Sequence, residues 1–178
     1  NLFPVVRDVE SLQRARSRQE LASELEAVLR GPAWQDQLNE FKDREMFRID
    51  MRHILGQVES YTGFSAELTD LAEVVLAAAC EQARRGLVAL HGTPEDQEGR
   101  PARFVLAALG KCGGRELGFA SDIELMFVFD GSGETTGPRT IPSPEFFERL
   151  VVEVTRAIRA RREGIFQIDL QLRPYGKA

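Results

Sequence analysis

The chain is poor in the residues that build metal-binding and disulfide-rich folds. Its 178 residues include two cysteines, Cys80 and Cys112, and two histidines, His53 and His91. None of the four has a partner at the spacing of a zinc site or a catalytic nucleophile. The composition therefore excludes a zinc finger and a disulfide framework. Two isolated cysteines are typical of buried thiols in a reducing compartment, so we expect a cytoplasmic protein.

Long apolar runs and basic clusters are missing as well. No stretch approaches about eighteen consecutive apolar residues, so we expect no membrane span. The first residues lack the charged and apolar regions of a secretory signal. The net charge is −5 without a clustered basic excess, which argues against nucleic acid as a partner. The sequence starts without methionine and stops abruptly, so we expect a C-terminally truncated fragment of a longer protein.

The residues that are present, 43% hydrophobic and 29% charged, are those of an ordinary globular protein. The pattern changes near residue 91. Before it, three segments have apolar residues at helical spacing: residues 11–29, 32–56 and 65–90. Ser65 is the predicted N-cap of the third helix.

After a polar loop, the pattern alternates between strands and helices. We predict strands at about 104–109, 122–129 and 164–174, and a helix from Ser143 to about 162. A helical turn is also expected after the glycines at 113 and 114. These elements predict an α+β fold with a helical region, 1–91, and a small mixed-sheet core, 92–178.

Two acidic residues stand close together in the stretch "GKCGGRELGFASDIELMFVFD", residues 110–130. On a strand, Asp122 and Glu124 share a face, with side chains starting roughly 7 Å apart. Two carboxylates at that spacing repel each other unless a cation lies between them, and Mg²⁺ is the hard ion that takes such oxygen ligands. If the strand that carries Asp169 is a neighbour, three carboxylates converge. They could then hold two metal ions about 4 Å apart for phosphoryl transfer.

The same stretch contains the elements of a phosphate site. Gly113 and Gly114 would let backbone amides approach a phosphate, and a helix N-terminus after them would add a favourable dipole. Lys111 and Arg115 supply positive charge, and the hydroxyl of Ser121 can donate to a phosphate oxygen.

Each of these features alone also has a structural interpretation. An Asp-x-Glu on a strand is most often a solvated face, and a Gly-Gly pair is most often a plain turn. Arg173 could equally form a salt bridge with Asp169. The combination of glycines, paired acids and a later strand acid is much more specific than any of its parts.

The combination resembles the polymerase-beta-like nucleotidyltransferase superfamily: a Gly-Gly pair, seven residues, then acid-apolar-acid-apolar, then a later strand acid. More narrowly, "LGKCGGRELGFASDIELMFVFD" followed by "FQIDLQLRPYGKA" resembles the bifunctional bacterial glutamine synthetase adenylyltransferase/adenylyl-removing family. The upstream segment "EFKDREMFRIDMRHILG" is similar to the helical segment of that family.

The resemblance implies an activity: transfer of AMP from ATP to a tyrosine of glutamine synthetase, or its removal by phosphate. The aromatic residue in "RPYG" favours the AMP-removing half. ATP, ADP or AMP would be substrates or products, Mg²⁺ the cofactor, and the PII signalling protein a possible regulator.

The resemblance also implies roles for individual residues. Asp122 and Glu124 would ligate both metals, and Asp169 the metal that activates the attacking oxygen. Residues expected to meet nucleotide phosphates or an anionic substrate are Gly113, Gly114, Ser121, Lys111 and Arg173.

Two positions depart from the family pattern. Glu124 stands where the family usually has aspartate, and Gln171 replaces a basic residue. Two alternatives therefore stay open. The first is another protein nucleotidylyltransferase, similar to uridylyltransferases. The second is a degenerate, non-catalytic module that senses nucleotide or binds a partner.

Overall fold

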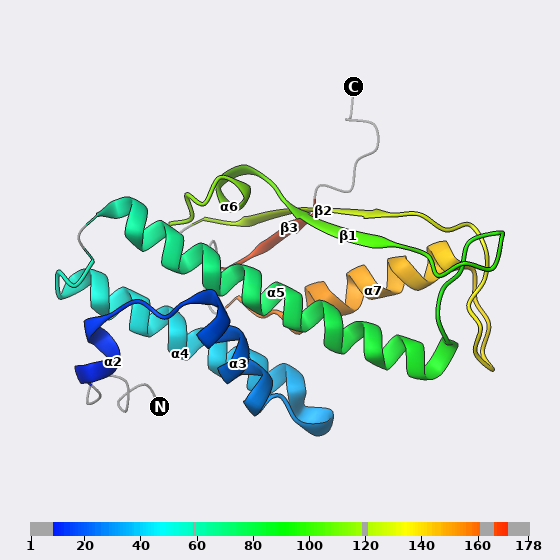
Figure 1. Ribbon diagram of the computed structural model, residues 1–178, viewed down its shortest axis with the longest axis horizontal. Helices are drawn as coiled ribbons and strands as arrows, with labels where there is room; N and C mark the ends of the chain where they lie inside the picture. Colours follow the sequence, from blue (N-terminus) through cyan, green and yellow to red (C-terminus); the bar gives the residue numbers. More distant parts are fainter. Residues whose placement is uncertain (1–8, 59, 119–120, 161–165, 171–178) are drawn as a thin grey trace.

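The computed structural model describes residues 9–58, 60–118, 121–160 and 166–170. In chain order the elements are α2 (Val9–Gln13), α3 (Arg18–Val28), the 3₁₀ turn η1 (Gly31–Ala33), α4 (Trp34–Ile54), α5 (Tyr61–His91), β1 (Phe104–Ala108), α6 (Gly110–Gly113), β2 (Ile123–Phe129), α7 (Ser143–Ala157) and β3 (Ile168–Leu170). Figure 1 shows the strands along the upper side of the molecule, with the long helices α4, α5 and α7 below them. The expected α+β fold is confirmed.

The sheet is mixed, with strand order β1-β2-β3. β1 pairs with β2 in the antiparallel direction, with Phe104 opposite Phe129. β2 pairs with β3 in the parallel direction, with Glu124 opposite Asp169. The predicted strands at 104–109 and 122–129 are confirmed to within one residue. β3 is shorter than the predicted 164–174, part of which lies outside the described residues.

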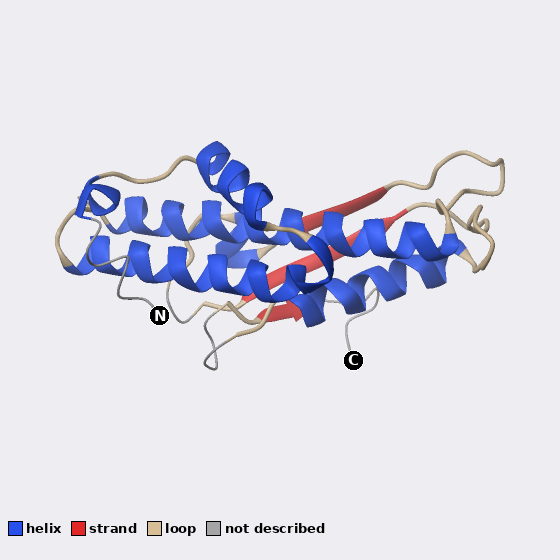
Figure 2. Ribbon diagram, turned by 90° about the horizontal axis from the view of Figure 1, so that it is seen from below, coloured by secondary structure: helices blue, strands red, loops and turns tan. Residues whose placement is uncertain are grey.

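One face of the sheet packs on the helices and the other is open. Ile123, Leu125 and Phe127 are buried, whereas the residues between them point to the opposite side. Because side chains alternate along a strand, this pattern fixes which residues β2 presents on the open face. Figure 2, seen from the helical side, shows the strands behind the helices. Phe147 of α7 stacks under the sheet on Phe129.

The long helix α5 begins earlier than predicted. Its N-cap is Ser60, whose Oγ accepts the N–H of Gly63 at 3.1 Å. Ser65, the predicted N-cap, is buried inside the helix. The prediction was wrong because Ser60, in an extended conformation, already satisfies a free amide of the first turn.

The first predicted helix, 11–29, is two helices, so a single helix there was wrong. Ser17 caps α3 in a reciprocal capping box with Glu20. The segment between α2 and α3 is held by Arg48 of α4, whose Nη1 donates to the carbonyl oxygens of Ser11 and Arg14 at 3.3 and 3.4 Å. A tertiary contact therefore replaces the helical hydrogen bonds of this segment.

Helix α7 ends at Ala157 rather than near 162. Ile158 is extended, and the N–H of Arg159 donates to Oδ1 of Asn39 in α4 at 2.8 Å. The chain leaves the helix because this side chain on α4 captures the next backbone amide.

The hydrophobic core is continuous between the helices and the sheet, since Leu71 of α5, Leu125 of β2 and Val154 of α7 belong to one buried cluster. The boundary at residue 91 remains a prediction. In the part of the chain that the structure describes, no helix combines the length and the apolar character needed to cross a bilayer.

Candidate active site

The predicted acids lie on the open face of the sheet. Glu124 and Asp169 are direct partners across the parallel β2–β3 pair. Neighbouring strands are about 4.8 Å apart, and partners point to the same face. Asp122 precedes β2 by one residue, lies two residues before Glu124 and is exposed. The strands that carry Glu124 and Asp169 are thus neighbours, which was the condition for the three carboxylates to converge.

The carboxylates share a face without forming a closed cluster. Among the described residues, no group of three or more His, Cys, Asp and Glu side chains is arranged to hold a metal ion. Ion pairs do not neutralise the first two acids either. Within the same residues, Asp122 and Glu124 form no ion pair with a lysine or arginine. The start of β2, the central strand, therefore carries negative charge on the open face that attracts cations.

Gly110 gives Glu124 the space that it occupies. A Cβ atom on Gly110 would lie 2.4 Å from Oε2 of Glu124, and the φ of Gly110 is +52°. A backbone hydrogen bond also connects the two segments, since the N–H of Leu109 donates to the carbonyl oxygen of Glu124 at 2.9 Å. Sequence reasoning missed Gly110, although a glycine directly after a strand and before a Gly-Gly pair was a signal.

The glycine pair lies differently from the prediction. The short helix α6 begins at Gly110 and ends at Gly113, so the glycines stand at its C-terminal end. The expected helix N-terminus after them was wrong. The N–H groups of Gly113 and Gly114 donate to the carbonyl oxygens of Leu109 and Gly110, both at 2.9 Å. A contact with phosphate remains a prediction for both residues.

Close packing explains the first glycine of the pair. A Cβ atom on Gly113 would lie 2.5 Å from the backbone oxygen of Ala108, which no rotamer change could relieve. The nearest atom to a Cβ on Gly114, the backbone oxygen of Gly110, would be 3.4 Å away. Gly113 thus has a structural reason to be glycine that Gly114 lacks.

The two basic residues of the motif differ in their surroundings. Lys111 is exposed on α6. Arg115 donates through Nη2 to Oδ1 of Asp70 in α5 at 2.9 Å, and this hydrogen bond raises the pKa of the guanidinium group. Arg115 therefore ties the α6 turn to the helical layer.

Ser121 is not brought to the acids. It is buried, and its Oγ accepts the N–H of Gly118 at 3.0 Å. With Ile123 it lines a cavity of about 10 Å³ on the helical side of the sheet. Its predicted contact with a phosphate has not been tested. Arg173 and Gln171 lie outside the described residues, and so do the interactions predicted for them.

Cys112, within α6, has no chemical role in this arrangement. Its thiol is buried, and burial raises its pKa to about 11. At neutral pH the group is a protonated, weak nucleophile. Both Cys80 and Cys112 are free thiols, in agreement with the absence of a disulfide framework in the sequence.

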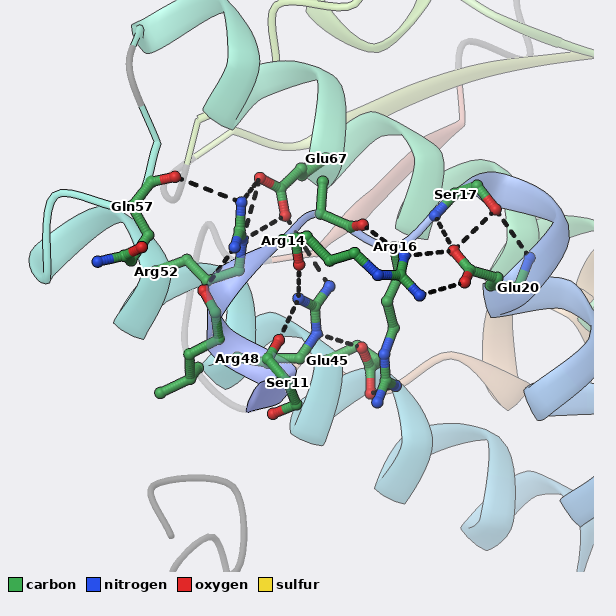
Figure 3. Close-up of polar contacts among 12 residues, drawn as sticks. Ser11, Arg14, Arg16, Ser17, Glu20, Glu45, Arg48, Arg52, Gln57 and Glu67 are labelled. Atoms are coloured by element: carbon green, nitrogen blue, oxygen red, sulfur yellow. Dashed lines mark hydrogen bonds and ion pairs between the residues drawn. The ribbon is translucent and has the colours of Figure 1, made fainter. Parts of the chain in front are cut away.

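The largest feature that sequence reasoning missed is a buried polar network in the helical layer (Figure 3). Glu45 of α4 accepts Nε of Arg48 and Nη1 of Arg16, both at 2.7 Å. Arg52 donates through Nε to Oε2 of Glu67 in α5 at 3.1 Å. Glu45, Arg48 and Arg52 are spaced by three and four residues, which places them on one face of α4 and was visible in the sequence.

Comparison with known proteins identifies the family. A family model described as "Glutamate-ammonia ligase adenylyltransferase" matches residues 5–178. The class that this match defines is that of adenylyltransferases. The chain belongs to the glutamate-ammonia ligase adenylyltransferase family.

Curated relatives agree with this assignment. A protein of Thioalkalivibrio sulfidiphilus is 38% identical over 176 residues, covering 94% of this chain and 18% of the relative. A protein of Shewanella loihica is 34% identical over 169 residues (91% and 18%), and one of Aromatoleum aromaticum is 35% identical over 179 residues (90% and 19%). Each is named "Bifunctional glutamine synthetase adenylyltransferase/adenylyl-removing enzyme". The chain spans less than a fifth of the length of these relatives.

Proposed function

We propose that this chain is the catalytic core of the AMP-removing half of a bifunctional glutamine synthetase adenylyltransferase/adenylyl-removing enzyme. The observation that carries the proposal is the register of Glu124 with Asp169 on parallel strands, with Asp122 on the same open face, in a member of this family. The free thiols support our expectation of a reducing, cytoplasmic location.

The donor set suits Mg²⁺ by its chemistry, although the three side chains do not form a closed cluster among the described residues. Three carboxylates offer hard oxygen ligands in neighbouring strand positions, and no lysine or arginine among the described residues neutralises Asp122 or Glu124. Asp122 and Glu124 would hold two ions and Asp169 one of them. When bound, the metal ions would offset the charge of the phosphates beside these acids.

In the proposed reaction, an oxygen of inorganic phosphate forms a bond to the phosphorus of the tyrosine-linked AMP. The bond between that phosphorus and the tyrosine oxygen breaks. The products are ADP and a tyrosine whose oxygen takes up a proton. Because the open face leaves Asp122 exposed, a tyrosine presented by another protein can reach the acids. Lys111 and Arg173 would attract the phosphate. The Glu124 carboxylate can occupy its position because Gly110 has no side chain there.

In the addition of AMP, the tyrosine oxygen would instead form a bond to the α-phosphorus of ATP, the bond from that phosphorus to the β-phosphate would break, and pyrophosphate would leave. The "RPYG" sequence is our reason for preferring removal. PII is proposed as the regulator. A uridylyltransferase-like activity is a further alternative. Proteins modified with labelled AMP or with labelled UMP distinguish the two activities by which label is released.

A non-catalytic, nucleotide-sensing module is the second candidate. Two observations favour it: the amides of Gly113 and Gly114 are used within α6, and Ser121 points to the helices. Under this hypothesis the acids bind a metal–nucleotide complex that regulates the remainder of the protein.

The test is Asp122→Asn in the full-length protein, assayed with adenylylated glutamine synthetase and phosphate. Loss of several kcal/mol of charge stabilisation corresponds to a decrease in turnover of about a thousandfold. The matched control is Asp130→Asn, an exposed acid at the far end of β2 that pairs with Arg103. We expect near-normal turnover in the control. Unchanged turnover in the Asp122 variant would exclude the proposed function.

A further inference from the structure

A strip of apolar side chains lies on the open face of the sheet, beside the acids. We call it the open-face strip, and its members are Val105, Ala107, Met126 and Val128. β1 and β2 bring them together in pairs, Val105 opposite Val128 and Ala107 opposite Met126. The exposed fractions are 58% for Val105, 40% for Met126 and 49% for Val128. The core does not need these residues, because the opposite face of the same strands supplies it.

The solvent-facing side of an antiparallel pair is normally polar. A contiguous exposed apolar surface with a polar rim is typical of a binding surface for another protein. The strip has such a rim at both ends. Asp122 and Glu124 bound one end, and the other is bounded by Arg103 and Asp130, joined through Nε and Oδ2 at 2.7 Å.

We propose that the open-face strip binds the acceptor protein, by contacting an extended, apolar segment next to the modified tyrosine. This inference rests on the proposed function and specifies how the protein substrate is recognised. Met126 lies about 7 Å along β2 from Glu124, and Val128 about twice as far. With the tyrosine-linked phosphate at the acids, acceptor residues two to four positions away along an extended chain reach the strip.

The chemistry of the strip favours a protein segment over the other parts of the substrate. Four uncharged side chains offer nothing to a phosphate, which binds to positive charge or N–H donors. A nucleobase is usually enclosed in a concave slot, whereas three exposed side chains and the half-buried Ala107 form an open surface across two strands. Side chains at alternate positions of an extended peptide fit such a surface.

The experiment uses the full-length protein with the double substitution Val105→Thr and Val128→Thr. Threonine has nearly the same shape and is also favoured in strands, so the fold is preserved. The KM for adenylylated glutamine synthetase should rise about tenfold, which corresponds to the loss of roughly 1.4 kcal/mol of binding. The kcat and the KM for phosphate should stay unchanged. The control is Val152→Thr, a valine of α7 that is 43% exposed on the helical side.

Two outcomes would overturn the proposal. If the KM for free O-adenylyl-tyrosine rises as much as that for the protein substrate, the strip contacts the nucleotide. If the Tm falls by several degrees while both KM values hold, another part of the same polypeptide covers the strip.

A binding measurement separates this inference from the proposed function. Adenylylated glutamine synthetase is titrated by calorimetry onto full-length protein carrying Asp122→Asn, with and without the strip substitutions. About tenfold weaker binding with them supports docking, and equal binding contradicts it. Full turnover of the Asp122→Asn variant would instead contradict the proposed function itself.

Discussion

The helical layer and the open face of the sheet both contain neighbouring acids, but the two regions differ in whether these acids are paired with basic side chains. In the helical layer Glu45 is 1% exposed and accepts hydrogen bonds from Arg48 and Arg16. On the open face, Asp122 and Glu124 have no basic partner among the described residues and lie opposite or beside a third acid. Buried acids must be paired to fold, whereas unpaired acids on an open surface are available to a ligand. The difference is the one expected between charge that stabilises the fold and the charge that we propose binds a ligand.

The largest effect is expected from breaking a paired acid. Arg48→Leu removes one of the partners of buried Glu45, together with the hydrogen bonds to the α2–α3 connection. The free energy of unfolding should decrease by about 3–5 kcal/mol, since a buried charge loses its partner. Urea unfolding measures this change.

The matched control is Arg84→Leu, which breaks an exposed pair with Glu81 on α5. It should cost less than about 1 kcal/mol. Equal stabilities of the Arg48 and Arg84 variants would contradict a structural role for the network.

The next largest effect is expected at the glycine pair, where substitutions distinguish a role in packing from a role in binding. Gly113→Ala places a methyl group against the backbone oxygen of Ala108 and should destabilise the protein by about 1–3 kcal/mol. Gly114→Ala meets only ordinary contacts and should leave the Tm unchanged.

Turnover of the Gly114 variant then tests the phosphate prediction. A raised KM for phosphate at an unchanged Tm would support contact between this position and the substrate. A normal KM would contradict a close approach of the phosphate to position 114.

The smallest effect concerns the position of Glu124. Gly110→Ala places a methyl group against the carboxylate of Glu124. Turnover should fall about tenfold, because changes that displace a metal ligand typically lower activity by that amount. Gly56→Ala is the control, because Gly56 also has a positive φ, +68°, but has nothing within 4 Å of an added Cβ. Both variants place an alanine at a positive φ, so each carries left-handed backbone strain. Equal turnover in the two would contradict a positioning role for Gly110.

The elements with strong periodicity were predictable from the sequence. α4, β1 and β2 follow the apolar spacing closely. The errors arose where a distant residue decides the local structure. Arg48 holds the break between α2 and α3, and Asn39 ends α7. No local pattern of the broken segments contains that information.

The candidate site was predictable in part for the same reason. The alternation of β2 put Asp122 and Glu124 on one face, and the position of Asp169 required the pairing of β2 with β3. The same alternation argues against the predicted phosphate contact of Ser121. Ser121 is two residues from buried Ile123 and therefore lies on the same face as Ile123, not on that of Asp122. Gly110 was overlooked because its role depends on the path of the Glu124 side chain.

The most direct test of the central claim is the anomalous scattering of Mn²⁺ in crystals of the full-length protein grown with ADP. We predict manganese peaks bonded to carboxylate oxygens of Asp122 and Glu124, with Asp169 joining one of them. Peaks elsewhere, with Asp169 turned away from the β2 acids, would contradict the assignment of this open face as the site of phosphoryl transfer.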